Sequence, residues 1–125
     1  MLPAVGQGAL CIENRQADMR INAVLQKLDH DETRKVVLGE RAFLNRLGGG
    51  CQVPIAAHGR IKDGLFYLTG LVASVDGKTV IKEHLTGSET DAQKVGVDLA
   101  NKMITLGAGT IIENLMENAI DHEKR

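Results

Sequence analysis

Residues 53–85 read VPIAAHGRIKDGLFYLTGLVASVDGKTVIKEHL, and this stretch decides the fold of the chain. Two Asp-Gly pairs, Asp63-Gly64 and Asp76-Gly77, separate three segments rich in apolar and β-branched residues. An Asp-Gly pair between such segments is a strong hairpin signal, because both residues tolerate the backbone conformation of a tight turn. The pattern predicts a three-stranded antiparallel meander with strands over 53–60, 65–75 and 78–85.

Helical periodicity lies on both sides of this meander. Asp18 can cap the first helix, and Gly48-Gly49-Gly50 ends the second, because glycine is preferred just past a helix end. The expected fold class is α+β, a three-stranded antiparallel sheet covered on one face by helices. The helices are expected over 18–28, 31–47, 90–104 and 110–119.

The beginning of the chain is different. Residues 2–13 read LPAVGQGALCIE, an apolar segment with spaced glycines that predicts a buried strand. A buried strand needs neighbours, and none is close to it in the sequence, so this is an orphan strand. We expect its apolar residues to be disordered or to drive self-association when this chain is alone; they are Leu2, Val5, Ala9 and Leu10.

Composition excludes several classes of protein. The 125 residues are 43% hydrophobic, and 15 basic residues face 16 acidic ones, which argues against nucleic acid as a main partner. No apolar run approaches the ~20 residues needed to span a bilayer, and no secretory signal opens the chain, so we expect a cytoplasmic protein without a membrane partner. The four histidines are scattered and the two cysteines lie forty positions apart, so no metal site is expected.

The most specific local feature is GGGCQVPI, at residues 48–55. It has two explanations: a helix end and turn followed by a buried cysteine, or a loop that presents a reactive sulfur at Cys51. A thiol-dependent hydrolase would need a histidine beside that sulfur and a third group to orient it, and no spacing places His58 there. The Gly6-Gln7-Gly8 segment is weak evidence for a phosphate loop, since no third glycine or helix follows.

Several motifs together resemble the porphobilinogen deaminases, also called hydroxymethylbilane synthases. In order, the motifs are LPAVGQGA at 2–9, ERAFL at 40–44, GGCQVPI at 49–55 and LVASVDG at 71–77. The resemblance implies a three-domain enzyme of which this chain is the C-terminal portion. Residues 1–17 would be the strand and hinge that return to the absent first domain, and 18–125 the C-terminal domain to which the cofactor is attached.

The resemblance also implies the activity. Four porphobilinogens would be deaminated and joined into hydroxymethylbilane, a step of tetrapyrrole and haem biosynthesis, on a dipyrromethane cofactor held by a thioether to Cys51. Gln7, Gly8 and Gly50 would be further cofactor contacts. Gly48 departs from the family, which commonly has glutamate there.

The same resemblance limits what this chain can do alone. The family's catalytic aspartate and its arginine-lined cleft lie in the absent domains, so no catalytic residue is expected here and this chain alone is expected to be inactive. The complete enzyme is expected to be a monomer. The alternative is a non-catalytic α+β module that binds a ligand or partner and has an incidental cysteine.

Overall fold

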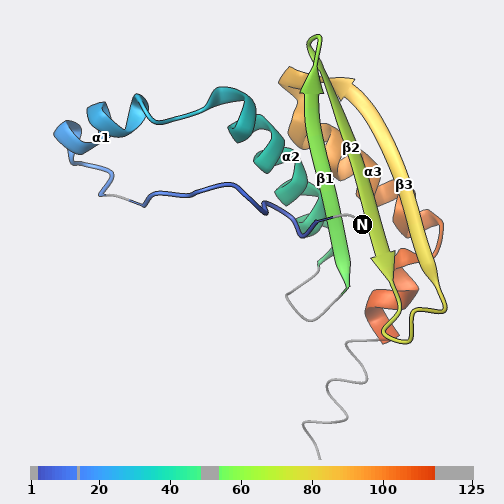
Figure 1. Cartoon of the computed structure of the whole chain (residues 1–125). Helices are drawn as coiled ribbons and strands as arrows, with labels where there is room; N and C mark the ends of the chain where they lie inside the picture. Colours follow the sequence, from blue (N-terminus) through green and yellow to red (C-terminus); the bar gives the residue numbers. More distant parts are fainter. Residues whose placement is uncertain (1–2, 14, 49–53, 115–125) are drawn as a thin grey trace, which may run out of the picture.

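A computed structural model describes residues 3–13, 15–48 and 54–114, and its centre is a single three-stranded sheet (Figure 1). The adjacent strands are antiparallel in the order β1-β2-β3, which confirms the predicted meander with small shifts of the strand ends. The strands are β1 (Ile55–Lys62), β2 (Leu65–Ala73) and β3 (Val80–Ser88).

Both Asp-Gly pairs lie in the turns between strands, as expected. Asp63 and Gly64 connect β1 to β2 and have φ angles of 53° and 76°, the left-handed backbone that a two-residue hairpin turn requires. The longer β2–β3 connection is closed by Ser74, whose N–H donates to the Thr79 carbonyl at 2.9 Å. Gly77 supplies the positive φ of this second turn, 73°.

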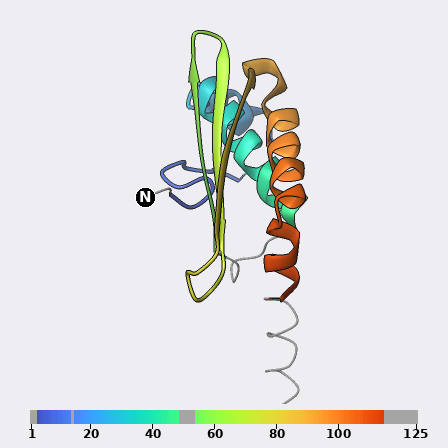
Figure 2. The same ribbon diagram turned by 90° about the vertical axis from the view of Figure 1, so that its right-hand side faces the viewer.

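Two helices cover one face of the sheet, α2 (Asp31–Leu47) and α3 (Ala92–Thr105) (Figures 1 and 2). A short 3-10 helix, η1 (Glu89–Asp91), precedes α3, and a further helical stretch occupies 108–114. The last of the predicted helices therefore begins slightly earlier than expected, and its end lies outside the described residues. The expected α+β class, with helices on one face, is confirmed.

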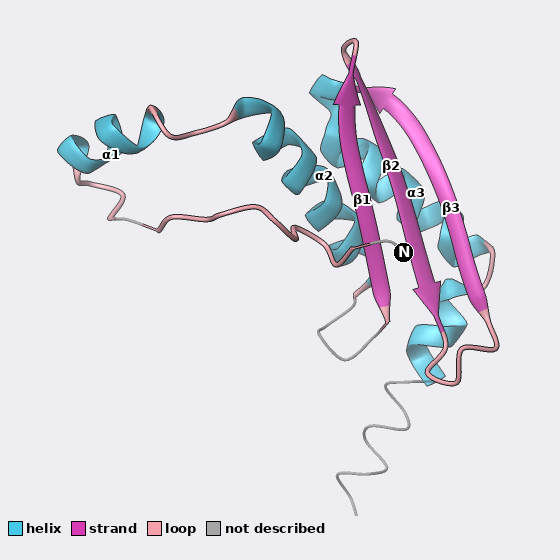
Figure 3. Cartoon of the chain, viewed as in Figure 1, coloured by secondary structure: helices cyan, strands magenta, loops and turns pink. Residues whose placement is uncertain are grey.

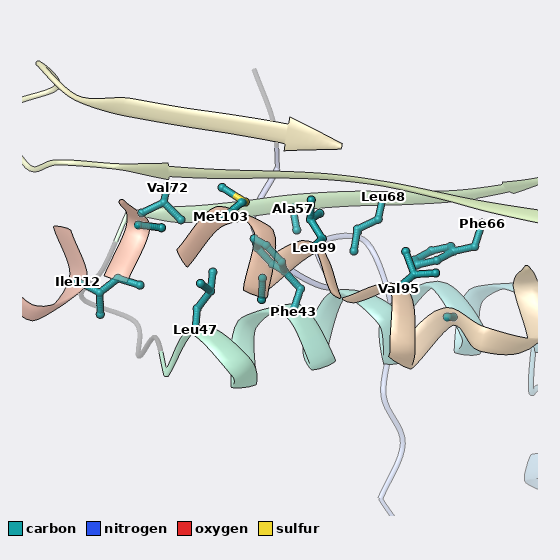
Figure 4. Close-up of a cluster of buried hydrophobic side chains, with 13 residues drawn as sticks. Phe43, Leu47, Ala57, Phe66, Leu68, Val72, Val95, Leu99, Met103 and Ile112 are labelled. Carbon is teal, nitrogen blue, oxygen red and sulfur yellow. The ribbon is translucent and has the colours of Figure 1, made fainter. Parts of the chain in front are cut away.

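The core lies between this face and the two helices. Along β2, buried and half-buried residues alternate, because successive side chains of a strand point to opposite faces. Phe43 and Leu99 are 0% exposed and belong to α2 and α3 respectively. The labelled buried side chains in Figure 4 are Phe43, Leu47, Ala57, Phe66, Leu68, Val72, Val95, Leu99, Met103 and Ile112.

Glycine allows α2 and α3 to pack very closely. A Cβ added at Gly96 would collide with the carbonyl oxygen of Gly39 and lie 2.9 Å from the backbone nitrogen of Phe43. Both obstacles are backbone atoms of α2, which a rotamer change cannot move. The absence of a side chain at Gly96 therefore fixes the distance between the two helices.

The helix α1 (Met19–Gln26) lies away from this packed body (Figure 3). The Asp18 carboxylate caps it by accepting from the N–H of Ile21 at 3.2 Å, as the sequence predicted. None of its residues is buried. Its apolar side chains are therefore left without the contacts that the apolar residues of α2 and α3 have.

The predicted strand over 2–13 is wrong for the part that the structure describes. Residues 3–13 contain turns and extended loop, and they have no strand on either side to pair with. The segment contacts the packed body through a backbone bond from the N–H of Ala57 to the carbonyl of Pro3 at 3.2 Å, and through Val5, which packs against the core. Without neighbouring strands this apolar segment does not form a strand, and Leu10 and Ile12 are exposed.

Candidate functional site

The loop that contains Gln7 and Gly8 is built from two consecutive turns. The N–H of Gln7 donates to the Ala4 carbonyl at 3.1 Å, and the N–H of Ala9 donates to the Gly6 carbonyl at 3.2 Å. Gly6 and Gly8 have φ angles of 72° and 86°, which side chains with a Cβ rarely adopt. The result is a compact loop in which Gln7 and Gly8 are both exposed.

The side chain of Gln7 is partly engaged within this loop. Its Oε1 accepts from the N–H of Ala4 at 3.1 Å. This leaves the amide Nε2 group, a two-proton donor, for other acceptors. A carboxylate ligand is a suitable acceptor for such a group.

Glu40 of α2 attaches this loop to the sheet. One carboxylate oxygen accepts from the N–H of Gly6 at 2.8 Å, and the other accepts from the N–H of Gly59 in β1 at 2.9 Å. The Glu40 residue is only 5% exposed. It therefore joins three segments that are far apart in the sequence, namely the N-terminal loop, α2 and β1.

Two hollows lie beside the loop. The one of about 400 Å³ is bordered by Gln7, Gly8 and Glu40 together with His58 and Arg60 of β1. The other, of about 560 Å³, lies between residues 6–12, α1 and α2, and the exposed free thiol of Cys11 is on its border. The candidate contacts Gln7 and Gly8 are thus exposed beside a space that a small molecule can enter.

The expected attachment residue, Cys51, and the expected contact Gly50 lie outside the described residues. The structure does describe both sides of that segment. Gly48 ends α2 with a left-handed φ of 70°, and the Pro54 carbonyl accepts from the N–H of Ala73 at 3.0 Å. The predicted glycine stop of the second helix is therefore confirmed, and the roles of Cys51, Gly50, Gln7 and Gly8 stay predictions.

His58 lies on the solvent face of the sheet, where it is exposed opposite Thr69, which in turn pairs with His84. The neighbouring row holds Arg60, whose guanidinium lies 5.1 Å from the centre of the Tyr67 ring. This arrangement is an aromatic and cationic surface rather than a nucleophile with its base. No carboxylate of β1, β2 or β3 points to this face among the described positions, because Glu83 alternates to the other side and pairs with Lys102.

No metal centre is present in the part of the chain that the structure describes, where no group of three or more His, Cys, Asp or Glu side chains could hold an ion. None of the helices over those same residues combines the length and apolar character needed to cross a bilayer.

Sequence reasoning missed Glu40 as a site residue. A signal was present, because Glu40 falls in the apolar stripe of α2 with Val36, Phe43 and Leu47. A carboxylate on the buried side of a helix requires hydrogen-bond donors, since its burial is otherwise costly. The donors are backbone amides, which sequence periodicity does not identify.

Residues 33–105 match the sequence model of the family described as porphobilinogen deaminase, C-terminal domain. The chain is similar to a porphobilinogen deaminase of Carboxydothermus hydrogenoformans, at 46% identity over 118 residues, which are 94% of this chain and 38% of that protein. Similar proteins of the same name occur in Shouchella clausii, 47% identical over 115 residues (91% of this chain, 36% of that protein), and Geobacter sulfurreducens, 42% identical over 123 residues (98% and 39%). The chain thus spans less than two-fifths of the length of these relatives.

Proposed function

Because the chain belongs to the porphobilinogen deaminase family, we propose that it is the C-terminal part of a hydroxymethylbilane synthase of tetrapyrrole biosynthesis. The observation that carries the proposal is the family match over 33–105, which includes the segment with Cys51 and begins before Glu40. In the complete protein, four porphobilinogens would be deaminated and joined to give hydroxymethylbilane.

Cys51 is proposed as the attachment residue of a dipyrromethane. Two porphobilinogens would be used and two ammonia molecules released: a C–S bond to Cys51 would replace the C–N bond of the first unit, with the thiol proton leaving in the ammonia, and a C–C bond between the pyrroles would replace the C–N bond of the second, with the pyrrole proton leaving in the other ammonia. When bound, the dipyrromethane would supply the pyrrole carbon to which the incoming units are joined. A thioether suits this role, because it is not broken by the reductants that open disulfides.

Gln7, Gly8 and Gly50 are proposed as contacts of the same group. The chemistry of the loop fits a carboxylate-bearing pyrrole, since Gln7 has an available amide donor beside a hollow of about 400 Å³. A glycine at position 8 exposes its backbone N–H and allows a ligand to approach closely. These residues would orient the group, whereas Cys51 would hold it.

The proposed domain boundary follows residue 17. Residues 1–17 would pack on a first domain in the complete protein, and 18–125 would form the C-terminal domain. Support comes from the exposure of the N-terminal segment, where Leu10 is 97% exposed. The packed body itself begins at α2, because α1 contributes no buried residue.

This chain alone is proposed to be inactive. Substrate carboxylates call for several converging arginines, because the guanidinium group pairs with carboxylates in a fork-shaped geometry. Among the described residues, Arg34 and Arg41 border the hollow of about 560 Å³, and Arg34 is already paired with Asp29. We further propose that the complete protein is a cytoplasmic monomer without a nucleic-acid or membrane partner.

The competing proposal is a non-catalytic α+β module with an incidental cysteine. The two are separated by turnover of the complete protein with porphobilinogen, together with an Ehrlich colour reaction for bound dipyrromethane. We expect Cys51→Ser to lose both, whereas the matched control Cys11→Ser keeps both, because Cys11 is an exposed thiol elsewhere. A complete protein with neither turnover nor colour would favour the competing proposal, whereas full activity and colour in Cys51→Ser would show that Cys51 is not the attachment residue.

A further inference from the structure

Glu40 is the buried charged residue of the described core, at 5% exposure. Burying a carboxylate is costly unless hydrogen bonds replace its hydration. Here both oxygens accept from backbone N–H groups, at 2.8 Å from Gly6 and 2.9 Å from Gly59. Such bonds to an ionised acceptor are short and strong.

The two hydrogen bonds of Glu40 connect it to segments that are packed differently. Gly59 belongs to β1 and is fixed by packing, because a Cβ there would lie 2.7 Å from the Phe66 ring and 3.2 Å from Val36. Gly6 belongs to the N-terminal loop, whose other contacts with the body are the Pro3–Ala57 backbone bond and the packing of half-buried Val5 against the core. The carboxylate thus connects a closely packed strand to a loop in which Gln7 and Gly8 are exposed.

Packing alone does not require a carboxylate at position 40. The neighbouring positions of the same helix stripe are Val36 and Phe43, and an apolar side chain would serve the core between them. What an apolar side chain could not do is satisfy the N–H of Gly6 and the N–H of Gly59 at once. The carboxylate at position 40 is therefore explained by its hydrogen bonds to the loop and β1, and not by the packing of the core.

We propose that Glu40 is a positioning residue that fixes Gln7 and Gly8 against β1. Gly6 directly precedes these two residues, and the turn bonds from Gln7 to Ala4 and from Ala9 to Gly6 transmit the attachment through the loop. Both oxygens of Glu40 are bonded to backbone N–H groups, so Glu40 acts through the loop that it holds. Its effect on the reaction rests on the proposed function, in which Gln7 and Gly8 contact the cofactor.

Hydrogen exchange of the unmodified chain tests the attachment without any substitution. The N–H of Gly6 is bonded to Glu40, whereas the N–H of Gly8 has no bond among the described residues. We expect the Gly6 amide to exchange at least about tenfold more slowly than the Gly8 amide, relative to their intrinsic rates. Equal protection of the two amides would overturn the proposal.

The variant Glu40→Gln extends the test. One oxygen is replaced by an NH₂ group that cannot accept, so either Gly6 or Gly59 loses its partner. Because Gly59 is held by packing, we expect the Gly6 amide to exchange about tenfold faster, with the Leu68 amide of β2 unchanged. The matched control is Glu32→Gln, an exposed glutamate of the same helix, which leaves the Gly6 amide as it was.

In the complete enzyme the positioning role predicts a division between KM and kcat. Glu40→Gln should raise KM for porphobilinogen about tenfold and change kcat less than about threefold. A merely destabilised control, Leu99→Ala in the core, should lower the melting midpoint and leave KM unchanged when assayed well below that midpoint.

Failure of this proposal is distinguishable from failure of the proposed function. An adduct on Cys51 together with an unchanged KM in Glu40→Gln would overturn the positioning role alone. Absence of any adduct on Cys51 would overturn the proposed function. The exchange rate of the Gly6 amide would still test whether Glu40 holds the N-terminal loop.

Discussion

Two regions of this chain have similar apolar side chains and very different surroundings. In the body, formed by α2, the sheet and α3, Phe43 and Leu99 are 0% exposed. In the N-terminal arm, residues 3–13 and 15–28, Leu10 is 97% and Met19 83% exposed. Burying a side chain of this size is worth roughly 1.5–3 kcal/mol, so the arm leaves considerable stabilisation unused. The difference shows that the apolar side chains of the body pack on one another, whereas several of those in the described arm are exposed.

The helix α1 makes the same point. It has eight residues, and isolated helices shorter than ~12–15 residues are marginal in water. Its cap at Asp18 is well formed, but Met19 and Val24 are exposed. A capped helix with an exposed apolar surface suits a segment that contacts a further domain, although the proposed boundary assigns α1 to the C-terminal domain.

The largest expected effect breaks the body. Phe43→Ala should destabilise the chain by about 3–5 kcal/mol, because it leaves a cavity among 0% exposed neighbours. Urea unfolding followed by circular dichroism measures the change. The matched arm variant, Leu10→Ala, should change the unfolding free energy by less than about 0.5 kcal/mol. Similar losses at the two positions would contradict the division into body and arm.

The next effect concerns the close packing of α2 on α3. Gly96→Ala should cost about 1–3 kcal/mol, because the added Cβ meets backbone atoms at Gly39 and Phe43. Gly109→Ala is a suitable control, since a Cβ there would lie 3.6 Å from Ile104, an ordinary contact. A thermal melt in which both variants match the parent would show that the helices are not held at this distance.

A smaller effect on stability is expected to differ between this chain and the complete protein. Leu10→Asp should leave the unfolding free energy of this chain within about 0.5 kcal/mol, since the residue is already in solvent. In the complete protein the same change should lower the melting midpoint by several degrees, roughly the effect of 1–3 kcal/mol in a multidomain chain, if the arm is buried there. An equal and negligible effect in both would mean that the arm stays exposed.

The smallest effect lies in the β2–β3 turn. Hydrogen bonds from the Ser74 hydroxyl and the Lys78 N–H to the carboxylate lower the pKa of Asp76 below its ordinary value. A lowered folded-state pKa contributes stability above the unfolded-state pKa, and this is lost as pH falls through the folded-state value. Asp76→Asn should therefore reduce the pH dependence of the melting midpoint in the acidic range slightly. An unchanged profile between neutral pH and the acidic range would show that these bonds carry no stability.

Much of the fold could be predicted from the sequence, because it depends on local signals. The Asp63-Gly64 pair, the Asp18 cap and the Gly48 stop each act within a few residues of the chain, and all three were located correctly. The strand over 2–13 failed for the opposite reason. An apolar sequence predicts that a segment is buried. Whether the segment forms a strand depends on a neighbouring strand with which its backbone can form hydrogen bonds.

The site divides in the same way. Gln7 and Gly8 were singled out through a resemblance and do lie together on an exposed loop. Glu40 escaped notice because its partners, Gly6 and Gly59, are 34 and 19 residues away and donate through their backbones. Long-range bonds to backbone amides depend on the folded arrangement of the segments, which residue identities alone do not encode.

The most direct test of the central claim is the intact mass of the complete protein, followed by peptide mapping of any adduct. We expect a mass above that of the sequence by one dipyrromethane, located on the peptide with Cys51 and missing in Cys51→Ser. A mass equal to the sequence in freshly purified, active protein, or an adduct located on another residue, would contradict the account.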